Sequence, residues 1–230
     1  MKRSQINAAI RRMEETAKKH GFLLPPFCGW TPENWLGKGH AYDEIRETML
    51  GWDVTDYGEG KFDELGFTLI TLRNGKPNSK YQKTYAEKLL MLEECQYSPM
   101  HFHWYKMEDI INRGGGNILI RVYNAAPDEK LADTPVTVFS DGRQYTVQAG
   151  TQVRLCPGES ITITPYLYHD FKVEPGTGPV LLGEVSMCND DANDNRFYEE
   201  LGRFPSIEED EPPYRLLCNE YPPAVEGEKA

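Results

Sequence analysis

The residues of this 230-residue chain that could act together in chemistry lie between His101 and Glu108. His101 and His103 are two positions apart, and side chains at that spacing on a β-strand point to the same face. Glu108 is at odd spacing from His103, so it joins them only if a tight turn leads into a returning strand. Imidazoles and a carboxylate in a closed pocket suit a divalent transition metal. The segment therefore predicts a metal site, and with it an enzyme.

A further ligand must come from a distant strand. Of the remaining histidines, His20 follows a surface helix, His40 lies in a glycine-rich loop, and His169 alone lies in the strand-rich half. His169 is therefore the predicted fourth ligand. The alternative is that the histidines are exposed or hydrogen-bonded core residues and that Glu108 is a solvated loop acid.

The first third of the chain reads as helical. Ser4 is the expected cap of a helix whose apolar residues recur at helical spacing up to Ala17. Thr31 and Pro32 have the types expected of a helix cap and a first helical residue. Residues 41–50 predict a third, short helix.

The central part reads as short strands separated by turns, which is typical of a closed barrel or jelly roll. The predicted strands are residues 67–73, 88–93, 100–103, 117–123, 136–139, 144–147, 152–155, 160–164, 169–173 and 180–187. We predict a mainly β fold and one domain over residues 1–230, with a helical N-terminal extension over 1–60 and a barrel over about 65–200. The acidic, proline-rich tail covers 205–230, and disorder is predicted at 225–230.

Composition excludes some partners. The net charge of −11 argues against nucleic acid, which needs clusters of basic residues. No apolar run is long enough to span a bilayer, and the N-terminus does not resemble a secretory signal. The five cysteines are scattered and form no Cys-x-x-Cys pair, which predicts reduced thiols and a cytoplasmic protein.

The histidine segment matches a known pattern. His101-x-His103-x4-Glu108-x6-Gly115 resembles the first motif of the cupin superfamily in every spacing. Gly158, Pro165 and His169 match the second motif loosely, with a proline–histidine gap that is one residue short and without the usual intervening glycine. The resemblance implies a cupin-type β-barrel or jelly roll.

Nearly the whole chain resembles bacterial D-lyxose isomerases of the cupin type. The resemblance is carried by residues 106–116, 183–186 and 189–197. It implies an aldose–ketose isomerase that interconverts D-lyxose with D-xylulose and D-mannose with D-fructose. It also implies a homodimer, and a Mn²⁺ ion held by three histidines and a glutamate, with other divalent metals possible.

Such an isomerase must polarise a sugar carbonyl and move a proton between C2 and C1. A divalent ion supplies a Lewis acid, and a positioned acid–base pair moves the proton. Glu184 is the expected base, because a charge inside an apolar strand is costly unless it has a partner or a role. Lys106 is the expected second catalytic residue and a donor to sugar oxygens. The alternatives are a solvated strand residue for Glu184 and an exposed turn lysine for Lys106.

Asp190, Arg196 and Tyr168 are the remaining expected substrate contacts. The alternatives are an ordinary loop residue for Asp190, a pair with a neighbouring aspartate for Arg196, and barrel core for the tyrosine. Two other functions share the same ligands: an iron-dependent cupin dioxygenase and a non-catalytic sugar-binding cupin. The residues alone do not choose between an enediol route and a hydride shift.

Overall fold

The computed structural model describes residues 1–190 and 193–226. Its helices are α1 (Arg3–Lys19), α2 (Pro32–Trp35) and α3 (Asp43–Glu47), with 3-10 turns at Pro26–Gly29 and His40–Tyr42. Its strands are β1 (Gly51–Thr55), β2 (Phe67–Arg73), β3 (Tyr85–Leu92), β4 (Tyr97–Phe102), β5 (Glu108–Gly115), β6 (Ile118–Ala125), β7 (Leu131–Ala132), β8 (Val136–Ser140), β9 (Arg143–Val147), β10 (Gln152–Leu155), β11 (Ser160–Ile163), β12 (Leu167–Val173), β13 (Val180–Met187) and β14 (Arg196–Phe197). In this part of the chain, no helix is both long and apolar enough to cross a membrane.

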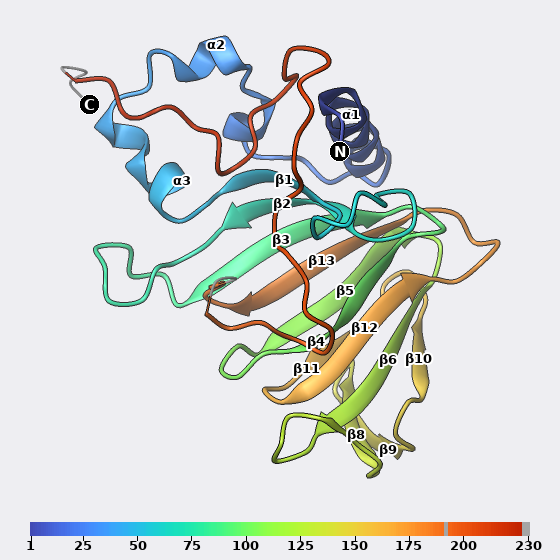
Figure 1. The fold of residues 1–230 in the computed structure, drawn as a ribbon. Coiled ribbons are helices and arrows are strands. Elements are labelled where there is room, and N and C mark those ends of the chain that lie inside the picture. The colour runs from blue at the N-terminus through green and yellow to red at the C-terminus, as the bar shows by residue number, and fades with distance from the viewer. Residues whose placement is uncertain (191–192, 227–230) are drawn as a thin grey trace.

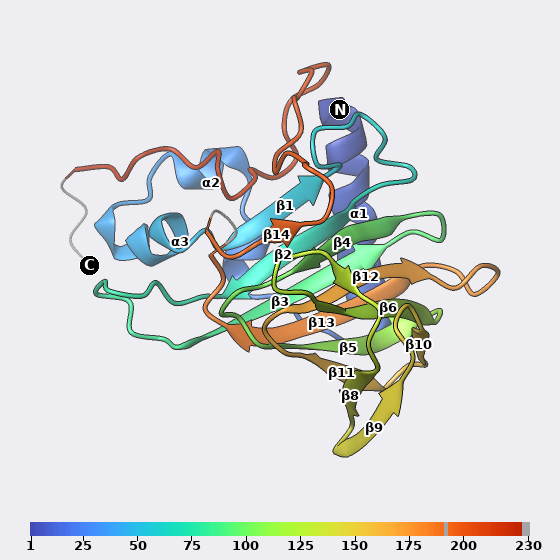
Figure 2. The ribbon, with the colours of Figure 1, turned by 60° about the horizontal axis from the view of Figure 1, so that its bottom comes forward.

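The strands form two facing antiparallel sheets, as expected for a cupin-type jelly roll (Figure 1). The larger sheet has the order β1-β2-β3-β13-β5-β11-β8-β9, and the smaller has the order β10-β6-β12-β4-β14 with β7 beside β6. Figure 2 shows β12, β6 and β4 lying against the larger sheet. Aliphatic side chains from both sheets fill the space between them, among them Leu90, Ile120 and Leu182. The predicted mainly β fold is confirmed.

All ten predicted strands are present, and three of them, β2, β10 and β13, have the predicted bounds. β5 begins at Glu108, so it is the returning strand that the histidine segment required. β1 lies inside the segment expected to be a helical extension. It forms the edge of the larger sheet by pairing with β2. The apolar Trp52 and Val54 alternate with the polar Asp53 and Thr55, and all five residues of the strand are buried.

Helix α1 covers the outer face of the larger sheet. Ile6, Ile10 and Met13 recur at helical spacing and pack in one cluster with Leu89 and Leu181 of the sheet. The expected cap is wrong, because the helix begins at Arg3 with Lys2 at the cap position. Ser4 instead donates its hydroxyl to Asp210 of the C-terminal segment at 2.7 Å. At the second predicted helix, Thr31 does occupy the cap position, and its backbone N–H donates to Asn34.

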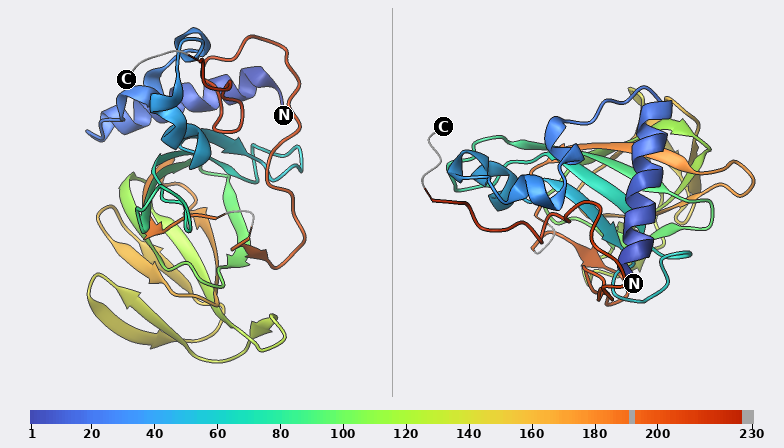
Figure 3. Two further views of the ribbon diagram at one scale, coloured as in Figure 1. Left: turned by 90° about the vertical axis from the view of Figure 1, so that its left-hand side faces the viewer. Right: turned by 90° about the horizontal axis from the view of Figure 1, so that it is seen from above.

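The C-terminal segment follows an irregular path back over α1 (Figure 3). The Arg3 guanidinium, which is almost fully buried, pairs with Glu209 at 2.6 Å and also with Glu220. The backbone N–H of Arg3 donates to Glu208 O at 2.8 Å. These contacts hold the acidic tail against the first helix at Glu208, Glu209 and Glu220. Most of the segment predicted to be disordered, residues 227–230, lies outside the described residues.

Candidate metal centre

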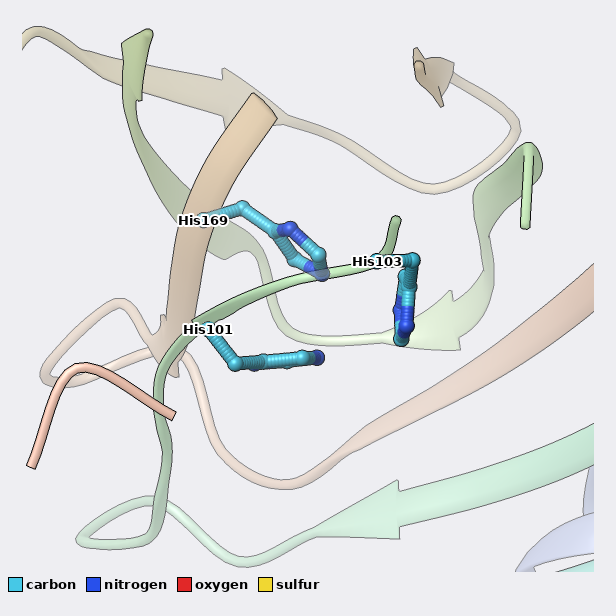
Figure 4. A group of neighbouring side chains, drawn as sticks. All are labelled: His101, His103 and His169. Carbon is cyan, nitrogen blue, oxygen red and sulfur yellow. The ribbon is translucent and has the colours of Figure 1, made fainter. Parts of the chain in front are cut away.

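Three histidines from two adjacent strands converge inside the barrel (Figure 4). His101 of β4 and His169 of β12 are cross-strand partners in the smaller sheet. His103 lies just after the end of β4, two positions from His101. One ring nitrogen from each of the three lies within 4.8 Å of the others. The predicted distant ligand is thus next to the first two because β12 pairs with β4.

Backbone carbonyl groups fix the orientation of all three rings. Nδ1 of His101 lies 2.8 Å from Pro99 O, Nδ1 of His103 lies 2.7 Å from Asp194 O, and Nδ1 of His169 lies 3.1 Å from Leu167 O. A carbonyl oxygen only accepts, so each Nδ1 carries a hydrogen, and Nε2 is the ring nitrogen left to face the cluster. In metal sites, a hydrogen bond of this kind from the other ring nitrogen orients the histidine toward the ion.

The donor set fits a divalent cation. Among the described residues, Nε2 of His103 and Nε2 of His169 are buried and make no hydrogen bond. Glu108 Oε1 lies 3.4 Å from the first and 3.3 Å from the second. Burial, and next the neighbouring His169 and His103 rings, hold the pKa of His101 well below its usual value, so this imidazole is neutral. Two buried nitrogens without partners beside a carboxylate suit an ion better than they suit a dry core.

Glu108 is ionised in this setting. Burial by itself raises the pKa of Glu108, but the neighbouring Lys106 ammonium outweighs it, so the pKa lies well below its usual range. The Lys106 Nζ atom lies 2.6 Å from Glu108 Oε2. One carboxylate oxygen therefore faces the histidines and the other faces the lysine.

A row of buried charges continues from Glu108 across the inner face of the larger sheet. Glu184 of β13 and Lys88 of β3 are cross-strand partners. Glu184 Oε1 lies 3.2 Å from the Nζ atom of Lys88 and 3.2 Å from that of Lys106. Two ammonium groups offset the cost of burying the Glu184 carboxylate. Lys106 and Glu184, the two expected catalytic residues, thus line the same cavity as His101, His103 and Glu108.

Asp194 holds the turn between the histidines and Glu108. Its carboxylate accepts the backbone N–H of Tyr105 at 2.9 Å and that of Lys106 at 2.8 Å. Its backbone carbonyl accepts the His103 ring hydrogen. One buried residue thereby positions both a histidine of the cluster and the lysine beside Glu108.

The other expected substrate contacts lie elsewhere. Tyr168 is on the face of β12 opposite to His169 because side chains alternate along a strand, and its hydroxyl donates to Glu129 O at 2.6 Å. The Arg196 guanidinium pairs with Glu129 at 3.0 Å, and neither it nor Tyr168 lines the cavity. Asp190 lines a neighbouring hollow that Lys106 also borders. The adjacent Asp191 lies outside the described residues.

The sequence reasoning missed Lys88 and Asn189 and gave Asp194 no role. Lys88 was detectable by the argument used for Glu184, because it is a charge beside the apolar run Leu89–Leu92. Asn189 Oδ1 accepts from Lys88 and lies 3.5 Å from Lys106 Nζ. Nothing in the local sequence marked Asn189 or Asp194 beyond their place in a segment of family resemblance.

The chain is similar to known proteins over most of its length. The family model described as D-lyxose isomerase matches residues 1–221. A D-lyxose/D-mannose isomerase of Serratia proteamaculans is 49% identical over 223 residues, covering 96% of this chain and 98% of the relative. A D-lyxose/D-mannose isomerase of Escherichia coli O157:H7 is 48% identical with the same coverage.

The fold is also that of solved isomerases. L-ribose isomerase of Cellulomonas parahominis aligns with a TM-score of 0.55 at 16% identity, covering 90% of this chain and 98% of the other. L-ribose isomerase of Acinetobacter sp. DL28, in complex with L-ribose, aligns with a TM-score of 0.55 at 14% identity and the same coverage. At these identities the likeness shows the fold alone.

Family membership decides among the functions that the residues left open. Neither a dioxygenase nor a non-catalytic sugar-binding protein is consistent with a match over the whole domain to one isomerase family. The chain belongs to the D-lyxose isomerase family and is a sugar isomerase that interconverts aldoses and ketoses.

Proposed function

We propose that this protein interconverts D-lyxose with D-xylulose and D-mannose with D-fructose, and that it uses a divalent metal ion, Mn²⁺ in the first instance. The observation that carries the metal requirement is the pair of buried, unbonded Nε2 atoms beside Glu108. His101, His103, His169 and Glu108 would hold the ion. When bound, it would supply Lewis-acid stabilisation of the charge that develops on the sugar oxygens. The choice of sugars rests on the relatives' names.

The chain's own residues supply the proton transfer. We assign Glu184 as the group that takes the proton from C2 and returns it to C1, since its buried carboxylate lines the cavity. Lys88 and Lys106 hold that carboxylate in place from two sides. Lys106 also lies where it can donate to a sugar oxygen bearing developing negative charge. This assignment favours the enediol route, because a hydride shift would need no carboxylate base.

We also infer a cytoplasmic homodimer. The location is supported by five cysteines that are all free thiols. The dimer is supported by the family resemblance, and light scattering on the purified protein measures it directly. A monomer at micromolar concentration would overturn the dimer and leave the proposed reaction unaffected.

The test of the reaction starts from enzyme stripped with a chelator. Separate samples receive Mn²⁺, Co²⁺, Ni²⁺, Zn²⁺ or Fe²⁺, and each is incubated without oxygen with D-lyxose, D-mannose, D-xylose or D-ribose. Ketose is expected from D-lyxose and D-mannose in the Mn²⁺ sample and from no sugar in the stripped sample. Full activity in the stripped enzyme would overturn the metal requirement, and conversion of D-ribose alone would overturn the substrate assignment.

A further inference from the structure

An arginine from the C-terminal segment reaches the cavity that holds the histidines. Arg203 lines this cavity together with Glu184, Lys88 and His101, although it follows β14 and belongs to neither sheet. Among the lining residues, only Arg203 carries a guanidinium group. It therefore brings a cation into the site from a part of the chain that the proposed proton transfer does not use.

Three contacts fix the position of Arg203. Its Nη2 atom lies 2.6 Å from Oδ2 of Asp53, a β1 residue whose side chain is 1% exposed. The guanidinium also lies over the Phe204 ring, 4.7 Å from the centroid. Its backbone carbonyl accepts the hydroxyl hydrogen of Thr55 at 2.7 Å. A guanidinium held in this way is a pre-organised donor, because little rotamer freedom remains to be lost on binding.

The buried polar residues that run from Glu108 through Glu184 and Lys88 continue toward the edge of the larger sheet. Arg203 lies at that edge, away from the histidines. Thr71 of β2 is the cross-strand partner of Lys88, which in turn is the partner of Glu184. Asp53 lies on β1, the edge strand, three strands from β13. With neighbouring strands about 4.8 Å apart, that is about 14 Å along the sheet from the Glu184 strand. The Arg203 side chain extends from this edge into the cavity.

We propose that Arg203, oriented by Asp53, donates hydrogen bonds to the hydroxyl groups at the end of the sugar away from C1 and C2, and thereby strengthens the binding of a hexose more than that of a pentose. Guanidinium N–H groups donate and sugar hydroxyl oxygens accept, so the chemistry of the pair matches. A site built to hydrogen-bond a hydroxyl group discriminates against an analogue that lacks it, because the donor is then left without that partner. The inference rests on the proposed function and adds a specificity determinant to it.

The test compares substrates that differ only at the remote end. D-mannose has the same configuration as D-lyxose at C2, C3 and C4 and is longer by one hydroxyl-bearing carbon, and 6-deoxy-D-mannose lacks the terminal hydroxyl. In Arg203→Gln, KM for D-mannose is expected to rise roughly tenfold and KM for D-lyxose by less than about threefold, as for loss of a hydrogen bond to a charged group. Arg203→Lys is expected to recover part of the loss.

The wild type should also convert 6-deoxy-D-mannose with a KM roughly tenfold above that for D-mannose, and this difference should vanish in Arg203→Gln. That readout compares two sugars on the same protein, so a change in folding alone does not move it. Arg154→Gln is the matched control, since Arg154 pairs with Glu174 on the surface, outside the cavity. It should leave all three KM values unchanged.

Equal losses for the three sugars in Arg203→Gln would show that Arg203 only ties the C-terminal segment to β1, and would overturn the specificity role. That result leaves the proposed function standing, because the wild type still converts D-lyxose and D-mannose. A wild type that converts neither sugar would overturn the proposed function and this inference with it.

Discussion

The two faces of the larger sheet differ sharply, although the same strands build both. The outer face of β1, β2, β3 and β13 packs against α1 through aliphatic side chains such as Leu89 and Leu181. The inner face of β3 and β13 carries Lys88 and Glu184, which are buried and paired. Because neighbours in a strand face opposite ways, Leu89 packs in the cluster with α1 while the adjacent Lys88 lines the cavity. Substitutions on the two faces should therefore have separable effects.

The largest effect is expected at the histidines of the inner cavity. His101→Ala removes one ligand of the predicted centre, and both bound metal and ketose formation should fall more than about a hundredfold, since even the loss of a hydrogen-bond partner of a ligand costs about 10–100-fold. Elemental analysis and a ketose assay on the same sample measure the two quantities. His40→Ala is the control, because His40 is exposed and bonds to Asp43. Full activity in metal-free His101→Ala would show that these histidines do not form a metal centre that the reaction needs.

A large effect confined to catalysis is expected at Glu184. Glu184→Gln keeps the shape of the side chain and removes the base, so metal content should stay the same while solvent-deuterium exchange at C2 falls about 10²–10⁴-fold. Proton NMR of the recovered sugar follows the exchange. Wild-type exchange rates in this variant would show that another group moves the proton.

The outer face should affect stability and leave catalysis alone. Ile10 of α1 is fully buried against the sheet, so Ile10→Ala should lower the free energy of unfolding by about 2–5 kcal/mol. Denaturant titration gives this value, and kcat per folded, metal-loaded enzyme should be unchanged. A fall in kcat at full metal occupancy would mean that the two faces of the sheet are coupled.

The smallest effect is expected on the outward face of β12. Tyr168→Phe removes the hydroxyl that donates to Glu129 O, which should cost about 1 kcal/mol of stability. KM for D-lyxose should not change, because the ring does not line the cavity. A tenfold rise in KM would instead support the prediction from the sequence that Tyr168 contacts the substrate.

The strands and the clustering of His101, His103 and Glu108 were largely predictable because their signals are local. The His101–His103 spacing gives a shared face, and the position of Glu108 requires a returning strand, which β5 provides. The strand-forming pattern likewise gave the bounds of β2, β10 and β13. The helix cap predicted at Ser4 was wrong because the helix already begins at Arg3, and Ser4 lies inside it, where its backbone N–H and its hydroxyl both donate to the distant Asp210.

Residue types and their spacing by themselves determined which segments form strands, where turns separate them and which side chains could share a metal ion. Only the tertiary structure decided that Lys88 and Lys106 both meet Glu184, that Asp194 supports Lys106 from 88 positions away, and that Arg203 enters the cavity. The physical reason is that the side of a strand to which a residue points follows from its position along the strand. A contact between distant segments depends instead on strand order and on how the C-terminal segment packs across the finished barrel.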